Sequence, residues 1–516
     1  MESLIAALRD PACYPHPVQE VELIETHISW VLLAGEYAYK VKKPVRLPFL
    51  DFGTLEARRR YCDEELRLNR RTAPGLYLEV VPIVHTARGF AISAPGEPLE
   101  YAVKMRRFGA EALADDMARR GALGPAQADA IAAALAGFHA SAPRARPGDP
   151  YGAPAGVAEP AIENFGQIAA LGTDAAMAAR LAQLRAWTAG ECRRLEGVFA
   201  ARKAAGRVRE CHGDLHLGNI AFIDGRAVPF DCIEFDPALR WIDVMSEVAF
   251  LVMDLIAHRL AGAAWRLLNR WLEASGDYEG IAVLRFYLVY RAMVRAKIAR
   301  IRGLDDPFRL YAGLAESLTR APPSPLVLMH GLPGSGKTTV SQVALERLGA
   351  VRLRSDVERK RLHGLALDAR TQAALDAGIY SAAASRRTYE HLAALAAGIL
   401  EAGYPAIVDA AFLQREQRDL FRQLADERGA SCAIAACTAP EAILRRRVIE
   451  RQSGAGDASD AGAAVLEHQL AIAQPFTPQE LAIVVAVETT GEDRIARALD
   501  ALAASLAARE EALAAH

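Results

Sequence analysis

One stretch decides the fold, Cys211-His212-Gly213-Asp214-Leu215-His216-Leu217-Gly218-Asn219-Ile220, and it is followed by Pro229-Phe230-Asp231-Cys232-Ile233-Glu234-Phe235-Asp236. Together they supply a carboxylate, an amide five positions later and a second carboxylate after the next apolar run. Asp214 can accept a proton from an alcohol, whereas Asn219 and Asp231 offer the hard oxygen ligands that magnesium ions on nucleotide phosphates prefer. The set predicts a site for phosphoryl transfer, with Asp214 as the catalytic base and with Asn219 and Asp231 as metal ligands.

The segment from His212-Gly213-Asp214 to Asn219 resembles the catalytic loop of aminoglycoside phosphotransferase-like kinases, which are related to choline and protein kinases. In that family the loop reads His-Gly-Asp-x-x-x-x-Asn, and the spacing here matches without a gap. The resemblance implies a bilobal protein-kinase-like fold that uses ATP and Mg²⁺. The alternative is a turn without chemistry between two strands, and the joint match of spacing, apolar flanks and Asp231 argues against it. His212 is expected to support the loop, while His216 is either a loop histidine with satisfied hydrogen bonds or a neighbour of the substrate.

Upstream, residues 28–33 and 37–42 alternate apolar and polar positions on either side of Ala34-Gly35-Glu36, which predicts a β-hairpin. Lys40 and Lys42 lie on one face of the second strand because side chains alternate with a period of two. In the kinase fold that the catalytic loop implies, a strand lysine binds the α and β phosphates of the nucleotide. We choose Lys40 for this role, and the alternative for either lysine is an exposed position on an edge strand.

Residues 51–73 carry apolar side chains at helical spacing, and Pro74-Gly75 ends the pattern. Glu64 and Glu65 lie on this predicted helix, and the resemblance implies that one of them, preferably Glu65, holds the lysine. The region from Lys40 to Arg71 resembles a bacterial branch of the kinase-like family that is usually fused to a P-loop kinase. The hairpin turn lacks the Gly-rich loop of other kinases, which argues against close wrapping of the phosphates by backbone.

Strands at 78–84 and 101–108 complete a predicted small lobe of about residues 1–108, and helices fill a second lobe of about residues 109–320. Asp243 lies in the segment from Arg240 to Val244, which opens a predicted helix that runs to about His258. It either organises the catalytic loop, as the resemblance implies, or caps its helix. The helical lobe carries no acidic cluster suited to a polycationic aminoglycoside, which weakens an antibiotic-resistance interpretation.

Residues 321–325, Ala-Pro-Pro-Ser-Pro, break the helical pattern and predict a linker between a first domain, residues 1–320, and a second, residues 326–516. The second domain opens with an apolar run, a Gly-x4-Gly-Lys-Thr loop and an amphipathic helix, which together predict a P-loop on a parallel sheet flanked by helices. A fortuitous Gly-rich turn is the alternative, and the strand and helix on its two sides argue against it. Lys337 is expected to reach the β and γ phosphates, and the Thr338 hydroxyl is expected to bind magnesium. The residues expected to contact the nucleotide are Gly331, Gly334, Ser335, Gly336, Lys337, Thr338 and Thr339.

Beyond the P-loop, Arg354-Ser355-Asp356 and Arg359 resemble the Arg-Ser-Asp-x-x-Arg segment of P-loop kinases that act on gluconate, adenylylsulfate and polynucleotide 5′-hydroxyl groups. The resemblance implies that Asp356 faces the acceptor hydroxyl, where a carboxylate can orient and deprotonate the alcohol. The two arginines would then lie near the acceptor or a phosphate, and a helix-capping Asp356 is the alternative. Asp409 ends a predicted buried strand at a Walker B-like position, where it would hold the magnesium shell or the acceptor.

Residues 441–451 predict a helix that bears Arg445, Arg446, Arg447 and Arg451, and the loop Ser453–Ala461 follows it. This segment resembles the mobile lid of the same kinases, in which an arginine closes over the transferring phosphate. We choose Arg447 as the nucleotide contact. A solvated arginine-rich helix is the alternative.

Composition sets further limits. The chain has 516 residues, 52% of them hydrophobic, which allows two or three domains with sizeable cores. Its formal net charge of −2 gives no global preference for nucleic acid or an anionic membrane. The apolar runs are too short to cross a bilayer, and the first residues lack a signal-peptide pattern. The seven cysteines are scattered without CxxC spacing, so we expect a cytoplasmic protein, and the Ala-, Arg- and Gly-rich composition favours a bacterial source.

The sequence therefore predicts a bifunctional ATP-dependent phosphotransferase, α+β in its kinase-like domain and α/β in its P-loop domain, with hydroxyl-bearing acceptors. The expected ligands are ATP, Mg²⁺ and a small-molecule acceptor; a nucleic-acid 5′-hydroxyl is less favoured, and no membrane partner is expected. One alternative is that only the P-loop domain transfers phosphate, the first domain being a ligand-sensing pseudokinase. Another is a nucleotide-gated regulator with slow hydrolysis. The pattern leaves the oligomeric state open.

Overall fold

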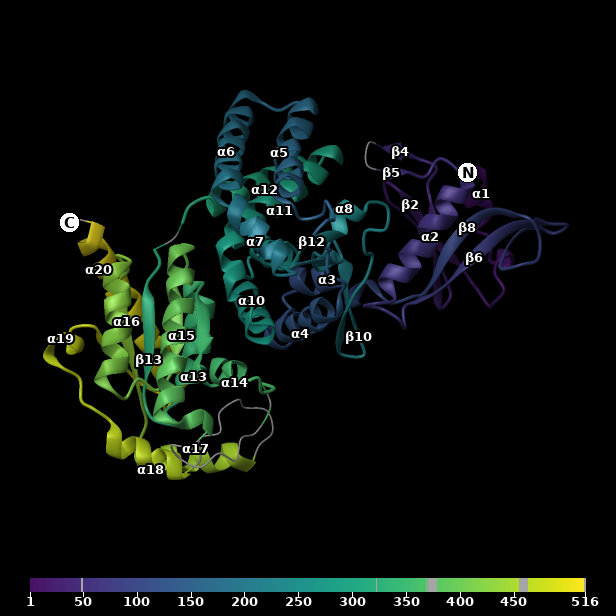
Figure 1. The fold of residues 1–516 in the computed structure, drawn as a ribbon. Helices are drawn as coiled ribbons and strands as arrows, with labels where there is room; N and C mark the ends of the chain where they lie inside the picture. Colours follow the sequence, from purple (N-terminus) through teal and green to yellow (C-terminus); the bar gives the residue numbers. More distant parts are fainter. Residues whose placement is uncertain (48–49, 322, 368, 370–377, 454–462, 515–516) are drawn as a thin grey trace. The chain divides into compact units, whose positions relative to one another are not determined.

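The chain divides into two compact units. The computed structural model describes residues 1–47, 50–321, 323–367, 369, 378–453 and 463–514. The first unit comprises Met1–His258 and Tyr290–Phe308, and the second comprises Arg259–Val289 and Arg309–His516. One boundary between the units therefore falls inside helix α11 (Ile281–Ile301): its first residues belong to the second unit and the others to the first (Figure 1).

The first unit begins with a six-stranded antiparallel sheet in the order β1-β2-β3-β8-β6-β7. Its strands are β1 (Val21–Glu25), β2 (Ser29–Ala34), β3 (Tyr37–Lys42), β6 (Tyr77–Thr86), β7 (Gly89–Ile92) and β8 (Pro98–Arg106). The predicted hairpin is confirmed, because β2 and β3 pair with Ala34 opposite Tyr37 and leave Gly35 and Glu36 as the turn. The strands predicted at 78–84 and 101–108 are confirmed as β6 and β8.

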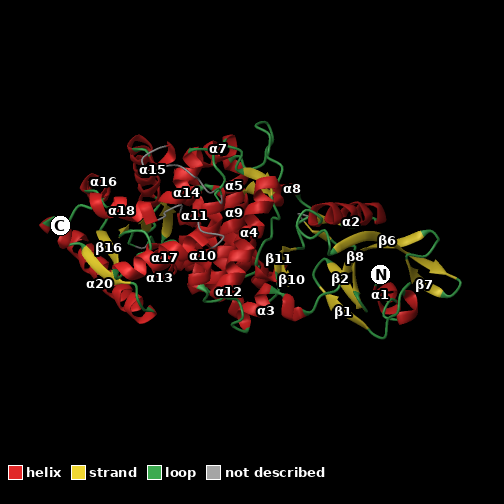
Figure 2. Cartoon of the chain, turned by 90° about the horizontal axis from the view of Figure 1, so that it is seen from below, coloured by secondary structure: helices red, strands yellow, loops and turns green. Residues whose placement is uncertain are grey.

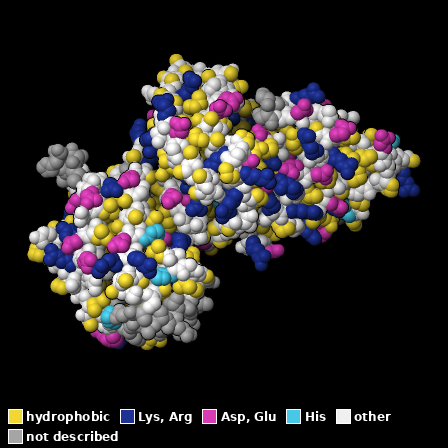
Figure 3. Space-filling model, viewed as in Figure 1, with side chains coloured by type: hydrophobic (Ala, Val, Ile, Leu, Met, Phe, Trp, Pro, Cys, Tyr) yellow, Lys and Arg dark blue, Asp and Glu magenta, His cyan; other side chains and the backbone are white. Residues whose placement is uncertain are grey.

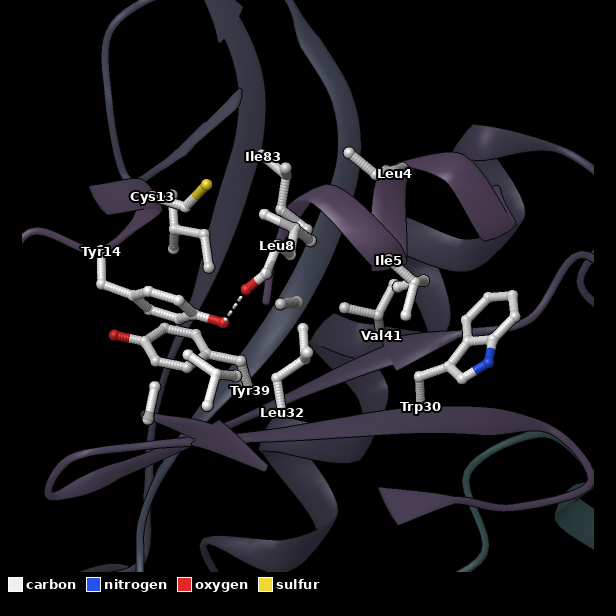
Figure 4. Packing of buried hydrophobic residues seen from close by; sticks show 14 of the residues in the cluster. Leu4, Ile5, Leu8, Cys13, Tyr14, Trp30, Leu32, Tyr39, Val41 and Ile83 are labelled. Atoms are coloured by element: carbon white, nitrogen blue, oxygen red, sulfur yellow. Dashed lines mark hydrogen bonds between the residues drawn. The ribbon is translucent and has the colours of Figure 1, made fainter. Parts of the chain in front are cut away.

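The two faces of this sheet pack against different layers. Tyr39 and Val41 of β3 join a core with the N-terminal helix α1 (Glu2–Ala7), and Figure 4 shows Val41 beside Ile5 of that helix and Tyr39 beside Tyr14. Ala38 joins a second core, in which helix α2 (Leu55–Asn69) covers the sheet. Because strand side chains alternate, Lys40 and Lys42 share the face of Ala38 and point toward α2. The hairpin thus places both lysines on the side of the sheet that faces helix α2.

A helical lobe completes the first unit, and Figure 2 shows how its helices separate from the strands of the small lobe. Its longer helices are α4 (Pro125–Ser141), α5 (Pro154–Ala170), α6 (Ala175–Arg194), α7 (Glu196–Ala204) and α9 (Val244–Ala257). Between them lie two short antiparallel pairs, β9 (Val208–Glu210) with β12 (Trp241–Asp243) and β10 (Ile220–Ile223) with β11 (Arg226–Pro229). The catalytic stretch joins β9 to β10. The helix predicted to open at Arg240 begins at Val244 instead, because residues 241–243 pair with β9 as a strand.

The second unit is built on a five-stranded parallel sheet in the order β14-β15-β13-β16-β17. The strands are β13 (Leu326–His330), β14 (Val351–Arg354), β15 (Ala406–Asp409), β16 (Cys432–Thr438) and β17 (Val484–Glu488). The main helices after β13 are α13 (Lys337–Leu348), α14 (Ser355–Leu362), α15 (Ala382–Glu401), α16 (Arg415–Glu427), α17 (Glu441–Ser453), α18 (Ala463–Ile472) and α20 (Glu492–Ala514). Helices α13 and α20 share an apolar core with the sheet. This is the expected α/β arrangement.

Helix α10 (Ala261–Ser275) also belongs to the second unit, where it packs along α13 and β14. The sequence places this helix in the lobe before the linker, and only its contacts reveal where it packs. The domain limits at 320 and 326 stay a prediction.

The surface charges, the cysteines and the helices can be compared with what the composition predicts. On the face seen in Figure 3, basic and acidic side chains are interspersed, in keeping with the net charge of −2. All seven cysteines are free thiols. Among the helices that the structure describes, none combines the length and the apolar character needed to cross a bilayer.

Candidate active sites

The catalytic loop of the first unit depends on a glycine. Gly213 has a φ of +92°, in the left-handed region that other residues rarely adopt. A Cβ atom there would lie 2.7 Å from the carbonyl oxygen of Leu239, so a larger residue would displace backbone. Gly213 therefore lets the chain turn sharply into Asp214.

Glu247 of α9 anchors this loop. Its Oε1 accepts hydrogen bonds from the backbone N–H of His212 at 2.7 Å and of Gly213 at 2.8 Å. Its Oε2 accepts one from His139 Nε2 at 2.9 Å. Burial raises the pKa of Glu247, but the His139 hydrogen bond and charge outweigh it and the pKa is lowered overall. Glu247 is thus held as a carboxylate beneath the loop.

The side chains of His139, Cys211 and Glu247 also lie close enough for a metal ion, with their ligand atoms within 4.8 Å of one another. Both carboxylate oxygens of Glu247 already accept hydrogen bonds. Burial, and next the charge of Glu247, raise the pKa of the Cys211 thiol well above its ordinary value. A neutral thiol is a poor metal ligand. This cluster fits an anchor for the loop better than a metal centre.

The hydrogen bonds of Asp243 go to Arg202 and to its own helix. Its carboxylate accepts hydrogen bonds from Arg202 Nε at 2.6 Å and Nη2 at 2.7 Å, and from the backbone N–H of Met245 at 2.9 Å. Of the two alternatives, the helix cap is confirmed. Sequence reasoning missed Glu247, although a carboxylate inside the apolar run of α9 was a usable signal.

The two loop histidines differ in their contacts. His212 Nε2 lies 2.7 Å from the carbonyl oxygen of Phe230, so this ring ties the loop to the segment that leads to Asp231. Its expected supporting part is confirmed. His216 Nδ1 accepts a hydrogen bond from the N–H of Gly218 at 3.1 Å, and its Nε2 lies 3.7 Å from Asp214 Oδ2. Burial lowers the pKa of His216. The ring is therefore a satisfied loop histidine that also borders the candidate base.

Asp214 keeps an accessible carboxylate, with 39% of its side chain exposed. Asn219 Nδ2 donates to the backbone oxygen of Asp214 at 2.9 Å and lies 3.4 Å from its Oδ2. The N–H of Phe230 donates to the backbone oxygen of Asn219 at 2.9 Å, which brings the chain before Asp231 beside this amide. The structure thus brings the three predicted residues Asp214, Asn219 and Asp231 onto adjoining segments. These oxygens suit a hard cation such as magnesium.

The predicted pairing of Lys40 with Glu65 is confirmed. Lys40 Nζ lies 2.8 Å from Glu65 Oε1, and it also contacts the carboxylate of Asp231. Lys42 Nζ lies 2.7 Å from Glu65 Oε2 and contacts Glu234. The edge-lysine alternative is wrong for both, because Lys40 is 8% exposed and Lys42 is fully buried. Sequence reasoning missed that one carboxylate holds both lysines.

These ion pairs set the charge of the site. Burial raises the pKa of Asp231, but the charge of Lys40 outweighs it, so the pKa is lowered overall. Burial lowers the pKa of Lys40, but Asp231 and then Glu65 outweigh it, so the pKa is raised overall. Burial raises the pKa of Glu234. The Asp231 carboxylate is therefore held ionised beside a buried ammonium group.

Helix α2 also fixes the backbone around Asp231. This residue has a φ of +64°, which is strained for a residue other than glycine. The N–H of Asp231 donates to the hydroxyl of Tyr77 at 3.1 Å, and the N–H of Cys232 donates to Asn69 Oδ1 at 2.9 Å. Asn69 Nδ2 in turn donates to the backbone oxygen of Glu65 at 2.9 Å. One helix therefore positions both the lysine partner and the metal-ligand segment.

The P-loop of the second unit has the conformation of a phosphate cradle. Gly331, Gly334 and Gly336 have φ values of +146°, +77° and +84°. Lys337 Nζ donates to the backbone oxygens of Gly331 at 2.8 Å and Leu332 at 3.0 Å. Among the described residues, the buried Ser335 Oγ has no hydrogen-bond partner. Such a loop at the start of α13 fits a bound phosphate.

Asp409 and Arg447 reach the loop from different elements. Asp409 lies beside Met329 in the sheet register, and its Oδ2 accepts a hydrogen bond from Ser341 Oγ at 3.1 Å. Arg447 Nη1 donates to the backbone oxygen of Gly334 at 3.1 Å and to Thr489 Oγ1 at 3.0 Å. Sequence reasoning missed Thr489, which also donates to the backbone oxygen of Ser335 at 2.8 Å.

The other lid arginines behave differently. Arg445 pairs with Glu441 at 2.6 Å, and Arg446 pairs with Glu450 at 3.7 Å; all four side chains are exposed. Solvated arginines are therefore present on the same helix as Arg447. The side chain of Arg451 and residues 454–461 of the predicted loop Ser453–Ala461 lie outside the described residues.

A cavity of about 1250 Å³ opens beside the P-loop, and its lining includes Lys337, Thr338, Asp356, Arg359 and Asp409. Helix α14 has no side-chain cap at its N-terminus, so the capping alternative for Asp356 is wrong. Arg359 is 8% exposed, and its Nη1 donates to the backbone oxygen of Ile379 at 2.9 Å and to Ser385 Oγ at 3.2 Å. The cavity thus joins a phosphate cradle to a carboxylate and a buried guanidinium.

Comparisons with known proteins match two parts of the chain to different families. A model of the phosphotransferase enzyme family matches residues 55–287, and a model of an AAA domain matches residues 326–476. Uncharacterized protein Rv2004c of Mycobacterium tuberculosis and uncharacterized protein Mb2027c of Mycobacterium bovis are each 31% identical over 467 residues, which cover 89% of this chain and 92% of each relative.

The chain is also similar to solved structures. A choline/ethanolamine kinase family protein from Mesorhizobium loti is 16% identical, with a TM-score of 0.37 and coverage of 62% of this chain and 95% of that one. A gluconokinase from Sinorhizobium meliloti is 22% identical, with a TM-score of 0.26 and coverage of 38% of this chain and 97% of that one. On the matches to the mycobacterial relatives and the two family models, the chain belongs to the family of these mycobacterial proteins, as a kinase with a phosphotransferase-family domain followed by a P-loop kinase domain.

Proposed function

We propose that the protein is a bifunctional ATP-dependent phosphotransferase that moves the γ-phosphate of ATP to hydroxyl groups of small molecules at one site in each domain. The observation that carries this proposal is that an accessible candidate base lies on a segment adjoining the charged residues expected to bind the nucleotide and magnesium. Asp214 is accessible beside Asn219. On the adjoining segments, Lys40 forms a buried ion pair with Glu65 and a partly exposed one with Asp231. A sensing domain without catalysis would not need this set.

In the first domain, Asp214 would orient the acceptor hydroxyl and take its proton as the new oxygen–phosphorus bond forms and the bond to ADP breaks. Lys40, held by Glu65, would bind the α and β phosphates. Asn219 and Asp231 would hold magnesium, which neutralises phosphate charge when bound.

In the second domain, the cavity supports the same chemistry with different parts. Gly331, Gly334, Ser335, Gly336 and Thr339 would surround the phosphates with backbone N–H groups, and Lys337 would bind the β and γ phosphates. Thr338 and Asp409 would hold magnesium. Arg447 would stabilise the P-loop that binds the phosphates. Asp356 would take the proton of the acceptor hydroxyl.

Arg359 supports an acceptor that carries a negative charge. Its partners in the described part of the chain are a carbonyl and a hydroxyl, together with the ring of Tyr380 at 5.2 Å. A buried guanidinium without a carboxylate partner is costly, and an anionic group on the acceptor would offset that cost. A nucleic-acid 5′ end stays the less favoured acceptor.

A cytoplasmic location is part of the proposal. ATP and a reducing environment are both found there, and the seven free thiols support it.

The test is transfer of labelled γ-phosphate from ATP into a pooled library of sugars, sugar acids, aminoglycosides, nucleosides and 5′-hydroxyl oligonucleotides. Wild type is compared with Asp214→Ala and Lys337→Ala, and each variant serves as the control for the other domain. Asp224→Asn, an exposed aspartate in the β10–β11 turn, is the matched control for a carboxylate change in the first unit. We expect one product to be lost in each variant and all products to survive in Asp224→Asn.

Two results would contradict the proposal. If Asp214→Ala leaves every product unchanged, the first domain is a pseudokinase, an alternative that the two-residue hairpin turn favours. If no product forms although ATP binds, the protein is a nucleotide-gated regulator.

A further inference from the structure

Helix α10, which precedes the linker, completes the edge of the P-loop sheet. Strand β14 is the last strand of that sheet, so one side of its backbone has no neighbouring strand. Asn269 fills this side: its Oδ1 accepts a hydrogen bond from the N–H of Arg352 at 2.6 Å, and its Nδ2 donates to the backbone oxygen of Ala350 at 2.8 Å. One side chain thus makes the two bonds that a neighbouring strand would make.

One turn further along α10, Glu273 lies between two arginines of β14. Its Oε1 accepts a hydrogen bond from Arg352 Nη2 at 2.6 Å, and its Oε2 lies 3.7 Å from Arg354 Nη1. Arg352 and Arg354 share this face because strand side chains alternate. Arg352 is 1% exposed and Glu273 is 6% exposed, so water screens this pair little.

The same guanidinium reaches the predicted magnesium site. Arg352 Nη1 donates to Ser341 Oγ at 3.2 Å and lies 3.5 Å from the backbone oxygen of Thr338. Ser341 Oγ donates to Asp409 Oδ2 at 3.1 Å. A continuous buried chain of contacts therefore runs from Glu273 through Arg352 and Ser341 to Asp409.

We propose that Glu273 is a positioning residue of the P-loop site, which holds Arg352 so that its charge does not oppose magnesium at Thr338 and Asp409. Through its other oxygen it steadies Arg354, which lines the cavity. The P-loop site is therefore completed by a residue that precedes the linker. This inference rests on the proposed nucleotide site of the second domain.

The charges determine whether loss of the Glu273 carboxylate should raise or lower the magnesium requirement. With Glu273 ionised, Arg352 carries a partner of opposite charge within hydrogen-bond distance. If Glu273 is replaced by Gln, a buried and unpaired guanidinium remains beside Ser341, and it repels a divalent cation bound to Asp409. We therefore expect the magnesium concentration for half-maximal nucleotide binding to rise on the order of tenfold in Glu273→Gln.

The experiment measures binding of a fluorescent ADP to the full chain as magnesium is titrated. Binding that disappears in Lys337→Ala is assigned to the P-loop site. Glu346→Gln is the matched control, because it breaks another ion pair between α10 and α13, Arg266–Glu346 at 3.0 Å, which is not a link in the chain of contacts from Glu273 to Asp409. The double variant Glu273→Gln/Arg352→Gln removes the unpaired charge, and we expect its magnesium requirement to return toward that of wild type.

The outcomes separate the inference from the function on which it rests. If wild type shows no Lys337-dependent binding, the proposed nucleotide site is wrong. If binding is normal and Glu273→Gln has the magnesium requirement of wild type, Glu273 has only a structural part. A double variant that stays as impaired as Glu273→Gln would show that the effect does not pass through Arg352, which also overturns the inference.

Discussion

Lys42 illustrates how much a single buried ion-pairing side chain can contribute to stability. It is fully buried between Glu65 and Glu234, whereas Lys104 pairs with the largely exposed Glu79 at 2.9 Å. Removing one partner of a buried ion pair leaves an uncompensated charge, while a surface pair contributes little.

We therefore expect Lys42→Met to lower the free energy of unfolding of the first unit by about 3–5 kcal/mol. Lys104→Met, the matched control, should lower it by less than about 1 kcal/mol. Native-state hydrogen exchange of the β3 amides measures both. Equal protection in the two variants would show that Lys42 is no more important than a surface lysine.

Sequence reasoning reached some of these residues and missed others for a physical reason. Lys40 and Glu65 could be paired because a strand period and a helix pattern place them, and the family resemblance supplies their contact. Nothing local distinguishes Lys42 from an exposed edge lysine, because its burial depends on Glu234, which is distant in the sequence. Glu247 and Thr489 were missed for the same reason: each acts on backbone that only the folded chain brings near.

At the scale of the elements, the P-loop contains positions that favour glycine. Gly334 has a φ of +77°, and a Cβ atom there would lie 2.7 Å from the backbone oxygen of Leu444 in α17. Gly398 lies inside helix α15, where a Cβ atom would meet nothing within 4 Å.

The two glycines therefore predict opposite outcomes for the same substitution. Gly334→Ala should weaken Lys337-dependent nucleotide binding by at least about tenfold, because a strained backbone conformation and a displaced α17 together cost more than about 1.4 kcal/mol. Gly398→Ala should leave binding intact and stabilise the second unit by about 0.5–1 kcal/mol. Nucleotide titration and thermal unfolding report the two effects. Intact binding in Gly334→Ala would mean that the loop adapts.

Helices and strands could be predicted where the pattern that specifies them lies within the segment itself. The β2–β3 hairpin and the run from β13 through the P-loop to α13 follow from side-chain period and turn residues, and they formed as expected. Residues 241–243 were expected to be helical, yet they pair with β9, a contact that no local pattern records. The packing of α10 on β14 likewise depends on tertiary contacts alone.

At the scale of the whole molecule, the two proposed nucleotide sites, one in each domain, predict a binding stoichiometry. The full chain with Mg²⁺ should bind about two ADP molecules, because the Lys40–Glu65 site and the P-loop each offer their own phosphate contacts. Lys337→Ala should bind about one, since the first site keeps all its residues. Isothermal titration calorimetry counts them. A wild-type value near one, falling to zero in Lys337→Ala, would remove nucleotide binding from the first domain.

The bond pattern of Asn269 also bears on how the chain can be divided. Its side chain binds the outward backbone groups of Arg352 on β14 and of Ala350 just before that strand. A fragment cut at the linker would leave that strand edge open, and an open edge invites strand addition from another copy and aggregation. Separating the two halves at the linker would therefore carry this risk, even if each half catalyses its own reaction.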